Sequence, residues 1–242
     1  MLSVLSVLSV SSVVVFLLPL SSAEPRPHNG HMATTNRQTR ILLASRSPER
    51  RRILEALGLS FESVATGVEE DTGAHLIPRE LVAALASAKA DAALELEPGY
   101  DLVIAADTIV ECDGAILGSP RSDAEARAML QKLSGRTHTI ITALVAVAPR
   151  TGKRANCVVE TEVTFRALDE QAIEAYIRTG EPLHKAGAYG IQGLGALLVE
   201  RVDGSHTNVQ GLPVEALAEA AAEVGFNLLD LVEPGALKAD RP

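Results

Sequence analysis

From residue 41 onward, hydrophobic and polar positions follow two different periods along the chain. Short apolar or alternating runs bounded by turn residues predict strands. The predicted strands are 41–45, 60–65, 102–106, "HTIITALVAVA" (138–148), "NCVVETEVTFRAL" (156–168) and "GALLVERV" (195–202). Apolar residues at helical spacing, with capping residues before them and glycines after them, predict helices. The predicted helices are 47–58, 78–96, 122–135, 169–179 and 213–224.

The order of these elements predicts a mixed α/β fold. Strands and helices do not alternate regularly, and the two long central strands are separated only by "PRTGKRA", which suits an antiparallel hairpin. We therefore expect a central mixed sheet with flanking helices instead of a doubly wound parallel sheet. The folded domain should span residues 40–230, with an N-terminal extension over 1–39 and a loose tail over 231–242.

The N-terminal extension begins with a low-complexity apolar run, "MLSVLSVLSVSSVVVFLLPL". No Lys or Arg precedes this run, so the basic region typical of a signal peptide is absent. Three interpretations stay open: an export signal, a membrane anchor, or a segment upstream of a start at Met32. The two cysteines, Cys112 and Cys157, form no disulfide framework, which favours a cytoplasmic location. We expect no stable membrane association of the domain itself.

Composition narrows the choice of ligand. The chain has a net charge of −9, 3% aromatic residues and no Trp. These values argue against binding of a nucleic acid polymer, which needs a basic surface or stacking platforms. A phosphate ligand would therefore have to be bound in a locally positive pocket.

"LVIAADTIVECDG" (102–114) places Asp107 where an apolar strand is predicted to end. Open α/β sheets bind their ligands at the carboxyl ends of strands, so this carboxylate is a candidate for chemistry. The alternative is a carboxylate that caps a local turn through Thr108. A covalent aspartyl-phosphate is disfavoured, because a second carboxylate is usually found two residues on and Ile109 stands there.

Two further segments carry candidate cations. In "ASRSPERRR", Ser45, Ser47 and Arg50 surround a predicted helix N-terminus, which favours anions. The alternative is a capped surface helix with solvated arginines. Lys89 lies on the apolar face of the helix over 78–96, so it either extends to the surface or reaches into a cleft.

Two loops complete the candidate site. "GVEED" offers Glu69, Glu70 and Asp71, either as a solvated turn or as ligands for Mg²⁺. The glycine-rich "TGEPLHKAGAYGIQGLGALL" (179–198) permits close approach of a ligand and would present Lys185, Tyr189 and Gln192. A flexible loop without a ligand is the alternative for this second segment.

In this order, the segments resemble the Maf family of nucleoside triphosphate pyrophosphatases across residues 40–225. The resemblance implies a Maf/inosine-triphosphatase-like fold with a deep cleft between two lobes. It also implies a divalent metal, Mg²⁺ or Mn²⁺, and it is compatible with a homodimer. The form "AYGIQG" is similar to the branch that acts on dTTP and UTP.

The resemblance also implies roles for individual residues. Asp107 would be the proton acceptor and would share the metal with Glu70. Residues matching substrate-binding positions are Ser45, Arg50, Lys89, Thr108, Lys185 and Gln192. Positions tied to the choice of base are Glu49, Thr108 and Gln192.

Three residues depart from the family pattern. Glu49 stands where an arginine is common, which leaves preference for another nucleotide open. Ser119 replaces a usual lysine, with Arg121 nearby as a substitute, and His184 replaces a common aspartate. The expected reaction is hydrolysis of a triphosphate to a monophosphate and pyrophosphate. The alternatives are a non-catalytic nucleotide-binding regulator of cell division and a metal-dependent phosphatase.

Overall fold

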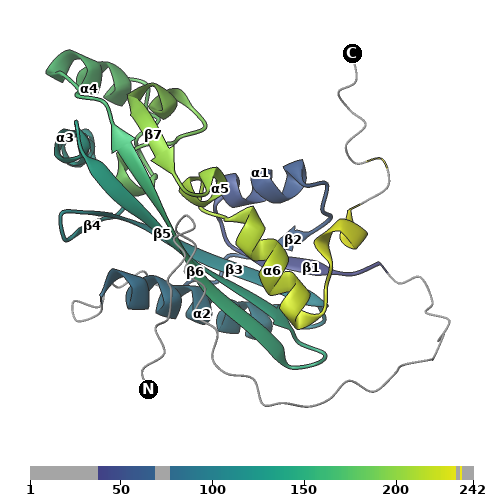
Figure 1. Ribbon diagram of the computed structural model, residues 1–242. Coiled ribbons are helices and arrows are strands. Elements are labelled where there is room, and N and C mark those ends of the chain that lie inside the picture. Colours follow the sequence, from purple (N-terminus) through teal and green to yellow (C-terminus); the bar gives the residue numbers. More distant parts are fainter. Residues whose placement is uncertain (1–37, 69–76, 233–234, 236–242) are drawn as a thin grey trace, which may run out of the picture.

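The structure, a computed structural model, describes residues 38–68, 77–232 and 235 (Figure 1). Nearly all of the predicted extension and much of the predicted tail lie outside the described residues. The described part contains a seven-stranded sheet in the order β2-β1-β3-β5-β6-β7, with β4 paired to β3. The strands are β1 (Ile41–Ala44), β2 (Glu62–Ser63), β3 (Leu102–Cys112), β4 (Ala115–Leu117), β5 (Thr137–Ala148), β6 (Lys153–Phe165) and β7 (Val199–Asp203).

The sheet is mixed, as the sequence predicts. β1 runs parallel to both β2 and β3, whereas β3, β5, β6 and β7 pair antiparallel in turn. The long hairpin of β5 and β6 keeps an unbroken register from Thr137↔Thr164 to Ala148↔Lys153. Because β3, β5 and β6 are each at least eleven residues long, they extend through the whole molecule and join its two ends.

Helices cover both faces of the sheet (Figure 1). They are α1 (Pro48–Ala56), α2 (Pro78–Leu96), α3 (Asp123–Leu133), α4 (Glu170–Ile177), α5 (His206–Val209) and α6 (Val214–Val224). Three short 3₁₀ segments accompany them: η1 (Ala186–Ala188), η2 (Leu194–Leu198) and η3 (Leu228–Leu231). One hydrophobic cluster lies under α1 and α6, another lies under α2 on the opposite face, and a third joins α3 and α4 to the far ends of the long strands.

Local sequence signals account for the helix ends. Ser47, Ser122 and Asp169 cap α1, α3 and α4 through side-chain oxygens that accept backbone N–H groups. α6 ends at Gly225, whose φ of 101° is in the left-handed region that glycine adopts without strain. The helix boundaries predicted from capping residues are therefore close to the observed ones.

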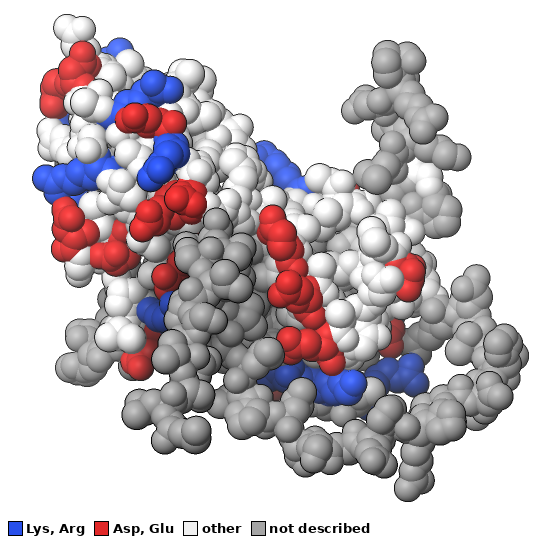
Figure 2. All heavy atoms as spheres, viewed as in Figure 1, with Lys and Arg blue, Asp and Glu red and all other residues white. Residues whose placement is uncertain are grey.

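Helix α6 is amphipathic. Its apolar side chains, including Leu217 and Val224, are buried against the sheet, while Glu215, Glu219 and Glu223 are exposed at a spacing of four residues. Figure 2 shows a row of acidic side chains along this helix. This row carries part of the net negative charge on a face turned away from the sheet.

Two of the predicted strands are wrong in part. The segment 60–65 forms a strand only over Glu62–Ser63, at the edge of the sheet. The segment "GALLVERV" begins in η2, and only its second half forms β7. The reason is that the backbone N–H groups of Leu194 and Gly195 donate to the carboxylate of Glu181 and not to a neighbouring strand.

His138 lies in a buried aromatic cluster at the end of the molecule that carries α3 and α4. Its ring packs edge-on against Phe165 and Tyr189, with centroids 5.0 and 5.5 Å away, and its Nε2 is 2.8 Å from the Tyr189 hydroxyl. Burial lowers the pKa of His138 to about 4. The imidazole is therefore neutral in the folded protein at neutral pH.

Acid should weaken the fold through His138. The folded pKa of about 4 lies below the ordinary value of 6.5, so the unfolded chain binds the extra proton between these values. Stability should therefore fall as the pH drops through this window, with a total loss of about 3 kcal/mol. Urea unfolding near pH 7.5 and at about pH 5 should show about 2 kcal/mol of this loss, because pH 5 lies within the window.

His138→Gln should remove most of this pH dependence, whatever it does to stability at neutral pH. His206→Gln is the matched control, because His206 is exposed, and it should retain the pH dependence of the wild type. A wild-type pH dependence in His138→Gln would contradict the assignment.

Candidate active site

Strand β3 has an interrupted edge. On one side it pairs with β5 from Val103 to Glu111. On the other side it pairs with β1 only as far as Ala105 and with β4 only from Val110. Neither β1 nor β4 pairs with the residues between them, and Asp107 and Thr108 lie in this gap.

The gap corrects the prediction that Asp107 ends a strand. β3 continues without a break through Cys112, so the carboxylate lies near the middle of the strand. The part that ends is the parallel pairing, because β1 stops at Ala44 and the chain turns through Ser45 into α1. Asp107 is two residues beyond the last pair, Ala44↔Ala105, and it is still near the carboxyl end of β1.

Asp107 points to the sheet face covered by α2. Successive side chains of a strand alternate between faces, and Val103 and Ala105 belong to the cluster under α2. Lys89 of α2 forms an ion pair with Asp107, and the two residues are 9% and 4% exposed. Lys89 therefore reaches into the site and does not extend to the surface.

Thr108 points to the opposite face, where it contacts Arg50 of α1. The Arg50 guanidinium donates to Thr108 Oγ1 at 2.9 Å, to Ser45 Oγ at 3.1 Å and to the Gly211 carbonyl at 2.8 Å. Thr108 Oγ1 also lies 2.9 Å from Thr142 Oγ1 of β5. These contacts hold a buried guanidinium in one orientation next to the gap.

Gly211 is a site residue that the sequence analysis did not single out. Its φ is 99°, and a Cβ there would lie 3.4 Å from Thr108 Oγ1 and 3.7 Å from Arg50 Nε. A side chain at this position would be strained by the positive φ and would lie in van der Waals contact with the guanidinium. Its segment, "NVQGLP" (208–213), contains no charged side chain that would indicate a site.

A second polar group surrounds Glu49, the residue before Arg50 on α1. Glu49 Oε1 accepts from Lys185 Nζ at 3.2 Å and from Arg52 Nη1 at 3.1 Å. Burial raises the pKa of Glu49, but the hydrogen bonds from Gln192 and Lys185 outweigh it and hold the pKa below its usual value. The carboxylate is therefore ionised at neutral pH.

The loop that carries Gln192 is held by Glu181. The Glu181 carboxylate accepts backbone N–H groups of Leu194 at 2.8 Å and Gly195 at 2.9 Å, and it accepts the Tyr176 hydroxyl at 2.9 Å. A Cβ on Gly193 would lie 2.5 Å from this carboxylate, so a side chain there would require the carboxylate to move. Sequence analysis missed Glu181, because an acidic residue after a helix resembles a solvated turn.

Tyr189 is not presented to a ligand. Its side chain is buried in the aromatic cluster with His138 and Phe165, and burial raises the pKa of its hydroxyl. The expectation that the glycine-rich loop exposes Tyr189 is therefore wrong. Lys185 and Gln192 of the same loop do come together, at Glu49.

Glu70, the second residue of the implied metal site, lies outside the described residues. Within residues 38–68 and 77–232, no group of three or more His, Cys, Asp or Glu side chains is arranged to hold a metal ion. Oxygen atoms are the ligands that Mg²⁺ and Mn²⁺ prefer. The groups near the gap offer such atoms, namely the Asp107 carboxylate and the hydroxyls of Ser45 and Thr108. The donor type fits, whereas the described donor set alone is too small for a site.

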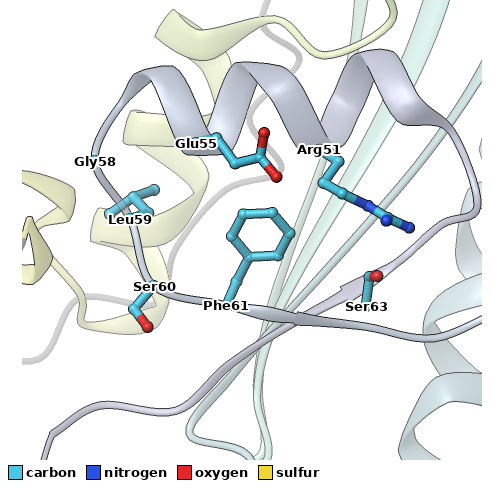
Figure 3. Close-up of a pocket in the computed structure, with 7 residues that line it drawn as sticks. All are labelled: Arg51, Glu55, Gly58, Leu59, Ser60, Phe61 and Ser63. Atoms are coloured by element: carbon cyan, nitrogen blue, oxygen red, sulfur yellow. The ribbon is translucent and has the colours of Figure 1, made fainter. Parts of the chain in front are cut away.

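A separate pocket of about 480 Å³ lies between α1 and β2 (Figure 3). Arg51 and Glu55 of α1 line one side, and Phe61 and Ser63, from the segment that contains β2, line the other. Its lining combines one guanidinium with one carboxylate, so it lacks the excess of positive charge that a triphosphate requires.

In the described part of the chain, no helix is long and apolar enough to cross a membrane.

Fold and site together define a mixed α/β protein whose polar side chains gather at an interrupted sheet edge. A family model described as Maf-like protein matches residues 40–224, and the chain therefore belongs to the Maf family. This confirms the family resemblance stated from the sequence.

Among similar proteins, the dTTP/UTP pyrophosphatase of Moorella thermoacetica is 47% identical over 191 residues, which cover 78% of this chain and 97% of that protein. The dTTP/UTP pyrophosphatase of Bacillus thuringiensis subsp. konkukian is 44% identical over 189 residues, covering 78% and 96%. The solved Staphylococcus aureus Ham1 protein aligns over 74% of this chain and 96% of its own, at 16% identity and a TM-score of 0.39. That structural likeness is too weak to support an argument.

Removing Lys89 should destabilise the fold more than removing an exposed lysine. Lys89→Met leaves the charge of Asp107 buried without this partner, and we expect a loss of about 3 kcal/mol in the free energy of unfolding. Adding Asp107→Asn should recover most of the loss, because the double variant no longer buries that charge. Urea unfolding of the two single variants and the double variant measures the coupling.

Lys153→Met is the matched control, since Lys153 is exposed, and it should change stability by less than about 0.5 kcal/mol. Equal losses in Lys89→Met and Lys153→Met would show that the ion pair does not contribute to stability.

Proposed function

We propose that the protein hydrolyses nucleoside triphosphates between the α and β phosphorus atoms, and that dTTP and UTP are its substrates. The observation that carries the proposal is the buried pair of Asp107 and Lys89 at the gap in β3, next to the anchored Arg50. The similarity to the Moorella dTTP/UTP pyrophosphatase over nearly its whole length supports the same reaction.

Asp107 is the general base in this proposal. Its carboxylate, which forms an ion pair with Lys89, would take a proton from the water that attacks the α phosphorus. Burial at a rigid strand fixes the carboxylate in position. The water has to approach from the open edge, where neither β1 nor β4 covers β3.

Arg50 and Lys89 would bind the phosphate oxygens. A guanidinium that is already oriented by Ser45, Thr108 and the Gly211 carbonyl loses little freedom when a phosphate binds. The N-terminus of α1 adds the positive end of a helix dipole. These groups would offset the negative charge that develops on the leaving pyrophosphate.

Asp107 and Glu70 would hold the divalent metal, Mg²⁺ or Mn²⁺. When bound, the metal would orient the phosphates and neutralise part of their charge. The nucleoside would lie next to Glu49, Lys185 and Gln192. Glu49 directly precedes Arg50 on α1 and contacts Lys185 of the glycine-rich loop, so this group would lie beside the phosphates. We place the reaction in the cytoplasm, which the free thiols of Cys112 and Cys157 favour, and a homodimer is compatible with this proposal.

Asp107→Asn tests the central role. Turnover should fall by about a hundred- to ten-thousandfold, the effect typical of a general base, because the amide cannot accept the proton. The measurement is pyrophosphate release from UTP and dTTP with Mg²⁺ or Mn²⁺, with products separated by chromatography. Asp113→Asn is the matched control, since Asp113 lies exposed in the turn between β3 and β4, and it should retain wild-type turnover.

The products separate this proposal from its alternatives. Release of orthophosphate would indicate a phosphatase, and tight nucleotide binding without product would indicate a regulator. Equal turnover of the wild type and Asp107→Asn would exclude Asp107 from the mechanism.

A further inference from the structure

We propose that Asn208 is a positioning residue for Arg50. Its buried side-chain amide joins α5 to β5 and β6, and it thereby fixes the Gly211 carbonyl that accepts from the Arg50 guanidinium. The inference rests on the proposed function, because the position of the guanidinium matters for the reaction only if Arg50 binds the phosphates.

Helix α5 is too short to hold itself in place. It has four residues, His206–Val209, and a helix of one turn is unstable on its own. Asn208 is the one residue of this turn that is buried, at 0% exposure. A short helix on a sheet ordinarily buries an apolar side chain. Here a polar side chain takes that position, so hydrogen bonds attach the turn to the sheet.

The side-chain nitrogen of Asn208 contacts three oxygen atoms of the sheet. It lies 3.2 Å from the Ile140 carbonyl of β5 and 3.3 Å from the Val159 carbonyl of β6. It also lies 2.9 Å from Thr161 Oγ1 of β6. An amide nitrogen donates to these oxygens, whereas the amide oxygen in its place would be repelled by the two carbonyls. The orientation of the amide is therefore fixed.

The other end of the same amide is costly. Asn208 Oδ1 is buried and has no hydrogen-bond partner among the described residues. A buried acceptor without a partner destabilises the fold, and an apolar side chain of similar size would avoid this cost. Stability alone therefore does not explain an asparagine at this position. What the asparagine adds is a set of directed bonds that place α5 on the sheet.

The backbone carries this placement from Asn208 to Arg50. The carbonyl of Asn208 accepts the N–H of Gly211 at 2.8 Å, which closes the turn after α5. The carbonyl of Gly211 then accepts from Arg50 Nε at 2.8 Å. α5 lies beside α1 in Figure 1, and one turn of backbone separates the anchored asparagine from the guanidinium. A displacement of α5 would therefore move an acceptor of Arg50.

A row of neighbouring residues across the sheet holds a second acceptor of the guanidinium. The row consists of Thr108 of β3, Thr142 of β5 and Val159 of β6. At one end, Thr108 Oγ1 accepts from Arg50 Nη2 at 2.9 Å. At the other end, the Val159 carbonyl accepts from Asn208. Because both ends belong to one sheet, Asn208 sets the distance between two acceptors to which the guanidinium is fitted.

Asn208→Leu tests the inference, because leucine has a similar size and cannot donate. We expect KM for UTP, from pyrophosphate release, to rise by about tenfold, the effect of displacing one hydrogen bond of a charged group. A variant that only loses folded protein would show a lower kcat with an unchanged KM. Thermal unfolding checks that the fold is retained.

A double-variant cycle with Arg50→Lys tests whether Asn208 acts through the guanidinium. In the Arg50→Lys background, Asn208→Leu should raise KM by less than about twofold, because the group that it positions is already gone. Ser134→Ala is the matched control. It removes a tie between the end of α3 and Leu168, on segments that hold none of the assigned site residues. Its KM should stay within about twofold of the wild type.

Nuclear magnetic resonance gives a measurement that needs no turnover. The Nε–H of Arg50, assigned by its loss in Arg50→Lys, is held by the Gly211 carbonyl. In Asn208→Leu it should exchange with solvent about tenfold faster or more, whereas Ser134→Ala should keep the wild-type rate. If Asn208→Leu does not fold, Thr161→Val takes its place, since it removes the acceptor at 2.9 Å and should also speed this exchange.

Three results would overturn the inference. They are an unchanged KM in Asn208→Leu, an equal rise of KM with and without Arg50→Lys, and a wild-type exchange rate of the Arg50 Nε–H in the folded variant. If the wild type releases no pyrophosphate from any triphosphate, the proposed function fails separately. The exchange rate then decides alone whether Asn208 holds the guanidinium.

Discussion

The site depends on one constraint, the gap in hydrogen-bond pairing along one edge of β3. In a continuous sheet a neighbouring strand would pair with the backbone on this edge, whereas Asp107 lies where β1 has ended and β4 has not begun. The other edge of β3 stays paired to β5 along its whole central part, so the backbone under Asp107 is fixed. One edge of the strand is therefore left unpaired and the other edge provides rigidity, at the same residue.

Burial of Asp107 has an energetic cost that the surrounding groups offset. A charged carboxylate that is 4% exposed loses most of its hydration, and Lys89 supplies a charge of opposite sign from α2. On the other face of the strand, Arg50 is held by oxygens from β3, from the loop before α1 and from Gly211. Two cations thus reach neighbouring residues of one strand from opposite layers, and each depends on the packing of its own helix.

Much of the fold could be predicted from the sequence because local signals determine it. Capping residues and glycines define α1, α3, α4 and α6, and the short "PRTGKRA" link predicts the hairpin of β5 and β6. The continuation of β3 past Asp107 could not be predicted, because its partner strand, β5, is distant in sequence. The same holds for η2, which replaces half of a predicted strand since Glu181 takes its backbone N–H groups. In the site, Lys89 and Arg50 could be predicted because they have charged side chains. Gly211 could not be predicted, because it contributes a backbone carbonyl group and has no side chain.

Helix α1 links the two ends of the site. Glu49 and Arg50 are consecutive residues, and Arg50 contacts β3 while Glu49 contacts the glycine-rich loop. A shift of the first turn of α1 would therefore move the Arg50 guanidinium and the contact between Glu49 and Lys185 together. Because Ser47 caps this turn and Ile53 and Leu54 bury its continuation, the turn is held by its own sequence and by the core. It follows that the packing and hydrogen bonds that fix Arg50 do not depend on the side chain at position 49, which contacts the glycine-rich loop instead.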